Sequence, residues 1–321
     1  MRFLSGKENL VDHLSLTEKT WLPKLKLFLA LSRTPHGLLD LGTPGLAALL
    51  CLGAFPPLGV TVLGLVTVFA GYTAVYALND VVDYRRDQAK LSEGGPTATG
   101  YLDEVMVRHP MAHGLLSFKE GLAWALAWAA VALLGAYLLN PVCALIFIFG
   151  CVLEAVYCFM LQKSHWRIVV SGVVKTLGGL AAVFAVNPSP SPLFLVLLFL
   201  FIFFWEIGGQ NIPADWYDLE EDRRWNAKTV PVHYGLEASG RLVLASLSLS
   251  LLLLLPLVGV SPLHYSWGLW ALALAAGVYL LIIPAARLYR TREGSQAMVL
   301  FNKASYFPLT LLLITLAALL G

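Results

Sequence analysis

The chain has 321 residues, of which 58% are apolar and only 13% are charged, and its formal net charge is +2. A soluble protein of this length needs much more polar surface, so the composition excludes an ordinary globular fold and favours a membrane protein. No cluster of basic residues resembles a nucleic-acid surface, and we expect no nucleic-acid partner.

The chain is predicted to begin with a cytoplasmic segment, residues 1–34. Within it, residues 21–31 read WLPKLKLFLAL, which mixes apolar residues with lysines. This pattern predicts a short helix that lies in the membrane interface.

Residues 35–321 are predicted to form one all-α domain, a polytopic membrane bundle of nine transmembrane helices around a central cavity. Apolar runs of about 20 residues recur here, and a helix of this length crosses about 30 Å of hydrocarbon. The runs are, roughly, 35–55, 58–79, 119–139, 141–161, 168–187, 192–211, 240–260, 266–286 and 303–320.

Basic residues precede the first run and follow the even-numbered runs, whereas the loops near residues 56, 140, 188 and 262 contain none. Because Lys and Arg collect in cytoplasmic loops, this predicts a multi-pass protein with a cytoplasmic N-terminus and a C-terminus on the opposite side. Two cytoplasmic loops, about 80–118 and 212–239, are long enough to form a cap over the bundle.

Each long loop carries the same pattern of acids, D-x-x-D-x-x-x-D. Residues 79–87 read NDVVDYRRD and residues 215–223 read DWYDLEEDR. Positions i, i+3 and i+7 share one face of a helix, so each stretch presents a row of three carboxylates. The rows consist of Asp80, Asp83 and Asp87, and of Asp215, Asp218 and Asp222.

One such row could be a solvated loop face neutralised by nearby arginines, but two rows of identical spacing on one side of the membrane favour a shared site. Unit charges about 4 Å apart repel by about 4 kcal/mol at an effective dielectric of about 20, so converging rows require a cation. A divalent metal that also binds phosphate oxygens, such as Mg²⁺, fits this requirement. Both rows are followed by P-x-x-x-G (Pro110 to Gly114 and Pro231 to Gly235), which indicates two related halves.

These motifs resemble those of the UbiA superfamily of intramembrane aromatic prenyltransferases. NDVVDYRRD is similar to its first signature, DWYDLEED with the trailing KTVPV to its second, and RHPMAHGLLS to its R-P-x-x-x-G-x-x-S stretch. The resemblance implies a Mg²⁺-dependent transferase that moves a polyprenyl group from its diphosphate, through an allylic carbocation, to an aromatic acceptor in lipoquinone-type biosynthesis. Its partners would be the polyprenyl diphosphate donor, a small aromatic or lipid acceptor and the bilayer.

The resemblance also assigns roles to residues. It implies metal and diphosphate ligands at Asn79 and at all six row aspartates, with Asp83, Asp87, Asp215, Asp218 and Lys163 as catalytic residues. Lys163 occupies the position of a basic diphosphate contact in the family. Arg85 and Lys228 are either further diphosphate contacts or solvated loop charges.

Other polar residues lie inside predicted spans, where ionisable groups usually have a function. Arg33, His36 and Asp40 share one helix face, where Arg33 and Asp40 form an ion pair or, alternatively, the group lines the substrate pocket. Asn211 is a further candidate for the pocket wall.

Glu154, Lys175 and Glu206 could form a buried network between helices. Glu206 is expected to be structural, whereas the roles of Glu154 and Lys175 stay open.

The chain departs from the family pattern at two places. Residues 91–104 are additional, and would form either a lid over the diphosphate or a surface insertion. His109 separates the usual R-P pair.

Alternative functions within the family are prenyl transfer to a glycerol-phosphate lipid, to haem or to a chlorophyll precursor, and terpene cyclisation without an acceptor. A cation transporter is an alternative from another class, which the position of the acids at helix ends disfavours.

Overall fold

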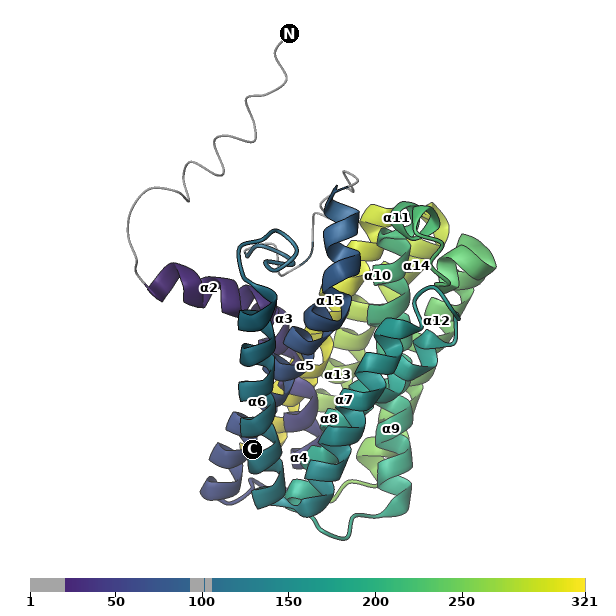
Figure 1. Ribbon diagram of the computed structural model, residues 1–321. Coiled ribbons are helices and arrows are strands. Elements are labelled where there is room, and N and C mark those ends of the chain that lie inside the picture. Colours follow the sequence, from purple (N-terminus) through teal and green to yellow (C-terminus); the bar gives the residue numbers. More distant parts are fainter. Residues whose placement is uncertain (1–20, 93–100, 102–105, 321) are drawn as a thin grey trace.

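The protein is a bundle of long, mostly antiparallel helices, which Figure 1 shows from the side. The structure, a computed structural model, describes residues 21–92, 101 and 106–320, and these residues contain helices, turns and loops but no strand. In chain order the elements are α2 (Trp21–Leu31), α3 (Thr34–Asp40), α4 (Gly42–Leu52), α5 (Leu58–Ser92), α6 (Phe118–Leu139), α7 (Pro141–Phe159), α8 (Arg167–Val186), α9 (Pro192–Glu206), the π-helical turn η2 (Ile207–Asn211), α10 (Ile212–Tyr217), α11 (Leu219–Arg224), α12 (Val230–Gly259), α13 (Trp267–Gly277), the π-helical turn η3 (Val278–Ile282), α14 (Ile283–Thr291) and α15 (Gly294–Leu320).

Eight helical stretches of the described chain are long and apolar enough to cross a membrane. They are α5, α6, α7, α8, α9–η2–α10, α12, α13–η3–α14 and α15. Large apolar side chains such as Leu134 and Phe159 lie exposed on the outer surface, as expected for contact with lipid. The protein is therefore an all-α, multi-pass integral membrane protein.

The first predicted span, 35–55, differs from the expectation of one long helix. It consists of the two short helices α3 and α4, which meet at Leu41. Helix α4 ends at Gly53, whose φ of 65° lies in the left-handed region that glycine tolerates best. The expected count of nine transmembrane helices is thus not confirmed.

The N-terminal helix α2 lies across the direction of the bundle rather than along it (Figure 1). Phe28 stacks on Trp124 of α6 with 4.8 Å between ring centroids, and the Trp124 indole donates a hydrogen bond of 2.8 Å to Ser32. The predicted helix over 21–31 is confirmed, and its position in the membrane interface stays a prediction.

The two predicted long loops are shorter than expected because their flanking helices extend beyond the apolar runs. Helix α5 continues through the first acid row to Ser92, and α12 already begins at Val230. Hydropathy marks where a helix leaves the hydrocarbon, not where it ends. The segment between α9 and α12 is itself helical, in α10 and α11.

The largest apolar core joins α4, α8, α9 and the C-terminal helices α12 to α15 around residues such as Trp205, Leu247 and Phe307. No buried residue of α5, α6 or α7 belongs to this core. Instead, α5 pairs with α6 through small buried residues such as Ala77 and Ala125. The space between these two groups of helices contains the cavity described next.

Candidate active site

A single large cavity of about 1160 Å³ runs along the inside of the bundle. Its wall extends from Phe55 and Pro56, near one end of α5, to Asp218 and Glu221 at the end where α10 and α11 lie. Between these ends the wall is mostly apolar. The cavity thus joins a charged mouth to an apolar channel.

The first acid row lies on α5 at this mouth. Asp83 and Asp87 line the cavity, whereas Asp80 is only 4% exposed and lines a small adjoining cavity. Asp83 forms an ion pair with Arg86, one turn later on the helix. A guanidinium nitrogen of Arg33 lies 3.4 Å from an Asp80 carboxylate oxygen. Each of these acids therefore has a cationic neighbour.

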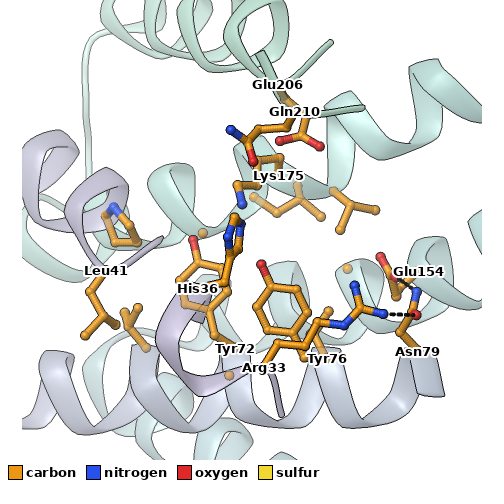
Figure 2. Close-up of a pocket in the computed structure, with 18 of the residues that line it drawn as sticks. Arg33, His36, Leu41, Tyr72, Tyr76, Asn79, Glu154, Lys175, Glu206 and Gln210 are labelled. Carbon is orange, nitrogen blue, oxygen red and sulfur yellow. Dashed lines mark hydrogen bonds between the residues drawn. The ribbon is translucent and has the colours of Figure 1, made fainter. Parts of the chain in front are cut away.

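Asn79 is held by its amide nitrogen. This nitrogen donates to Glu154 over 2.7 Å and to the Cys158 sulfur over 3.3 Å, while its oxygen accepts from Arg33 over 3.4 Å (Figure 2). The contact with Glu154 fixes which side of the amide faces the first row. The side-chain oxygen, an atom of the type that binds Mg²⁺, accepts from the same Arg33 nitrogen that contacts Asp80.

His109, which interrupts the family's R-P pair, faces the first row. Its Nδ1 lies 3.3 Å from Asp80 and 3.2 Å from Asp87, and the three potential ligand atoms lie within 4.8 Å of one another. Burial lowers the pKa of His109, but the two carboxylates outweigh this effect and raise the pKa to about 9. Its backbone is left-handed, with φ of 51°. Its role could not be predicted from the sequence, where it only interrupts the R-P pair.

The second acid row is divided between two short helices. Asp215 belongs to α10, Asp218 is the non-helical residue after it, and Asp222 belongs to α11. A buried guanidinium nitrogen of Arg167 donates to Asp215 over 3.1 Å, and the Tyr101 hydroxyl donates to Asp218 over 3.1 Å. All three acids line the cavity.

The environment of the second row opposes its negative charge. Burial, together with the Asp215 carboxylate, raises the pKa of Asp222. The Oδ2 atom of Asp215 is buried and has no hydrogen-bond partner among the described residues. Such a site is stabilised by an added cation.

The two rows meet at the same mouth. Lys90, on the last turn of α5, forms an ion pair of 2.5 Å with Glu221 of α11, and both line the cavity. This contact joins the helix of the first row to the helix of the second. Residues of both rows therefore line the same end of the cavity.

Three of the predicted basic residues do not line the cavity. Arg85, Lys163 and Lys228 are exposed and absent from the cavity wall, and their roles remain predictions. Arg86 and Arg167 line the cavity instead. Adjacent positions on α5 point about 100° apart, so Arg86 can face the cavity while Arg85 faces away from it.

Arg108 and Tyr101 also line the mouth. Neither was predicted as a site residue from the sequence. The Arg108 guanidinium lies 4.1 Å from the centroid of the Tyr101 ring. Tyr101 belongs to the additional segment 91–104, of which residues 93–100 and 102–105 lie outside the described residues.

The remaining predicted pocket residues do line the cavity. His36 is 5% exposed and stacks on Phe301 with 5.3 Å between centroids, and the Asn211 amide donates to the Tyr157 hydroxyl over 3.2 Å. Arg33 lines the wall near Asn79. Asp40 does not follow the ion-pair alternative, because it pairs with Lys175 over 2.6 Å.

The donor atoms at the mouth suit a hard divalent cation. Carboxylates of both rows and Asn79 line one cavity, and a buried oxygen of Asp215 has no hydrogen-bond partner within the described chain. Oxygen ligands of this type bind Mg²⁺, which fills its remaining positions with water and phosphate. The residues therefore fit the metal that the motifs imply.

Comparison with known proteins identifies the family. The sequence model of the UbiA prenyltransferase family matches residues 41–312. The chain belongs to this family. It is thus a transferase of prenyl groups, and the resemblance of the acid motifs is confirmed.

Similar proteins include other family members. The digeranylgeranylglyceryl phosphate synthase of Thermococcus sibiricus is 28% identical over 235 residues, which are 73% of this chain and 77% of the relative. The UbiA homologue of Aeropyrum pernix K1 has a TM-score of 0.70 at 18% identity and covers 89% of this chain and 97% of its own.

A second solved structure, the UbiA homologue of Archaeoglobus fulgidus bound to DMAPP and Mg²⁺, has a TM-score of 0.67 at 15% identity. It covers 91% of this chain and 98% of its own. Both solved structures show that the fold is that of the family.

Proposed function

We propose that this protein transfers a polyprenyl group from its diphosphate to a hydroxyl of a glycerol-phosphate lipid and so forms an ether. The similarity to a digeranylgeranylglyceryl phosphate synthase over 73% of the chain is the observation that carries the proposal. It favours the glycerol-phosphate alternative over the aromatic acceptor that the motifs first suggested. The apolar channel suits the long tails of both substrates.

We assign the diphosphate to the mouth between the two rows. Asn79 with Asp80, Asp83 and Asp87 on one side, and Asp215, Asp218 and Asp222 on the other, would hold Mg²⁺, which the A. fulgidus relative binds together with DMAPP. His109 would join the first group. When bound, Mg²⁺ supplies positive charge that stabilises the departing pyrophosphate.

The side chains of this protein contribute the rest. Arg86 and Arg167 extend the positive charge at the mouth, and Arg167 is oriented by Asp215 and by the Tyr157 ring, 4.1 Å from its guanidinium carbon. The apolar wall excludes water from the allylic cation, which water would otherwise capture. The rings of Tyr72 and Tyr76 line the cavity below the mouth and can stabilise positive charge.

We further propose that the mouth faces the cytoplasm, as the distribution of basic residues predicts. The N-terminus would then be cytoplasmic and the C-terminus would lie on the opposite side. The haem, chlorophyll-precursor, cyclase and transporter alternatives have no specific support from the cavity.

The test is a product analysis with purified full-length protein. Mg²⁺ and prenyl diphosphates of several lengths are combined with a glycerol-phosphate lipid, a hydroxybenzoic acid or a naphthoic acid, and product masses are measured. We expect an ether of the glycerol-phosphate lipid, which is lost when EDTA removes the metal. Prenylated aromatic products alone would restore the aromatic-acceptor function, and diphosphate release without any acceptor would indicate a cyclase.

A further inference from the structure

Below the charged mouth, polar groups from three helices line the cavity in the middle of the bundle. They are Tyr72 and Tyr76 on α5, Lys175 on α8 and Glu206 on α9 (Figure 2), and the buried Asp40 on α3 contacts Tyr76 and Lys175. Ionisable groups inside a membrane protein are energetically costly, so their presence at this depth usually indicates a function. Apart from the two tyrosine rings, none of them takes part in the ionisation proposed for the mouth.

Within this group, Asp40 is fully engaged. One of its oxygens accepts from Lys175 over 2.6 Å, and the other accepts from the Tyr76 hydroxyl over 2.5 Å. The side chain of His36 approaches to 3.9 Å. Asp40 thus neutralises Lys175, which lines the cavity.

Glu206 differs, because only one of its oxygens is used. Oε1 accepts from Ser171 over 3.0 Å, whereas Oε2 is buried and has no hydrogen-bond partner among the described residues. The residue is 7% exposed and lines the cavity. The hydroxyl of Tyr72, on the wall of the same cavity, is also buried and has no hydrogen-bond partner in the described chain.

Two buried polar atoms without partners on the wall of one cavity are available to a polar ligand. An unsatisfied buried polar group destabilises a protein by about 1–3 kcal/mol, and more when it is charged. A carboxylate accepts hydrogen bonds, and a tyrosine hydroxyl can donate or accept. A hydroxyl group satisfies both, since it donates to the carboxylate and exchanges a hydrogen bond with the tyrosine.

Glu206 and Tyr72 lie at the distance from the acid rows where the reacting carbon of the donor is expected. Tyr72 lies eight residues before Asp80 on α5, and Glu206 lies nine residues before Asp215. At about 1.5 Å per residue, both backbones are about 12–14 Å below the acid rows. A metal and diphosphate held at the mouth would occupy much of this interval, so the first carbons of the prenyl chain would lie on the Glu206 side of the mouth.

We propose that Glu206 and Tyr72 bind the acceptor hydroxyl, and that Glu206 takes its proton as the ether forms. The bond from prenyl C1 to the diphosphate oxygen breaks, and its electron pair leaves with pyrophosphate. The acceptor oxygen forms a bond to C1, and the hydroxyl proton passes to Oε2 of Glu206. This inference rests on the proposed function, because it requires an acceptor with a hydroxyl.

The test compares two buried carboxylates of one cavity, in Glu206→Gln and Glu154→Gln. Ether formation and the Mg²⁺-dependent affinity for a non-reactive thio-diphosphate donor analogue are both measured with the full-length protein. Glu206→Gln should lower kcat by about 100-fold, the usual contribution of a positioned base, with donor-analogue affinity within about twofold. Glu154→Gln should instead weaken the donor analogue, because Glu154 holds Asn79.

Two further variants separate a catalytic role from a structural one. Glu206→Asp should recover part of the rate, and Tyr72→Phe should raise the KM for the acceptor more than it lowers kcat. Unchanged ether formation in Glu206→Gln, or an equal loss of donor-analogue affinity in Glu206→Gln and Glu206→Asp, would overturn the assignment. If wild-type protein makes no glycerol ether, the proposed function fails independently of these variants.

Discussion

The two acid rows have the same spacing in sequence but different backbones. The first lies on α5, a continuous helix of 35 residues. The second follows a π-helical turn and is divided between α10, Asp218 and α11. Both rows nevertheless bring carboxylates to one mouth. Equal spacing therefore identifies a common chemical task without specifying a common shape.

The difference in backbone has a local cause. A Cβ atom on Gly208 would lie 2.9 Å from Leu247 and 3.0 Å from Ser246, so the π-helical turn packs directly against α12. Pro213 occupies the first turn of α10, where its missing N–H is tolerated. Packing positions the second row, whereas ionic contacts with Arg33, Arg86 and His109 surround the first.

The largest effect should come from removing one acid of either row. Asp83→Ala and Asp218→Ala should each lower turnover by about 100- to 1000-fold, because each removes a carboxylate that would hold the Mg²⁺ that stabilises the departing diphosphate. Turnover and Mg²⁺-dependent binding of the donor analogue are measured. Glu220→Ala, an exposed acid between two row positions, is the control and should be neutral. Near-normal turnover in either row variant would mean that this row does not hold the metal.

Arg167 tests whether the second row needs its buried arginine. Arg167→Ala should lower turnover by about 100-fold, since it leaves Asp215 buried without its partner. Lys163→Ala, at the exposed position that the family resemblance suggested, should change turnover by less than about twofold. The reverse order of effects would restore Lys163 as the diphosphate contact.

A methyl group at the π-helical turn tests the role of packing. Gly208→Ala should lower turnover by about tenfold, because overpacking of about 1–3 kcal/mol shifts the second row. Gly71→Ala on α5 meets Phe147 at an ordinary 3.7 Å and should be neutral. Turnover and melting temperature are compared. Equal effects would show that the two rows depend on packing to the same degree.

The smallest effect concerns donor length. Gly64 lines the channel on α5, and a side chain there would meet no atom within 4 Å, so Gly64→Phe should project into the channel. We expect nearly unchanged rates with short donors and a severalfold loss with long ones. Gly59→Phe, equally unobstructed but outside the channel wall, is the control. An identical donor preference in both variants would place the tail elsewhere.

Sequence alone predicts the helical membrane fold, the acids of the site and the family, because hydropathy and carboxylate spacing are one-dimensional signals. It does not predict which cations face inward. Arg86 and Arg85 are neighbours in sequence, and packing alone decides which one turns toward the cavity. Glu206 was expected to be structural, since nothing in its sequence context reveals that one of its oxygens faces a cavity.

The length of α5 sets the plane in which the chemistry occurs. Its 35 residues span about 52 Å, whereas the hydrocarbon of a bilayer is about 30 Å thick. Asp80 lies 22 residues after the start of this helix, or about 33 Å along it, just beyond that thickness. The length of the helix thereby places the first acid row at the edge of the hydrocarbon. The proposed diphosphate leaving group would then lie on the water side, and the lipid product would stay in the bilayer.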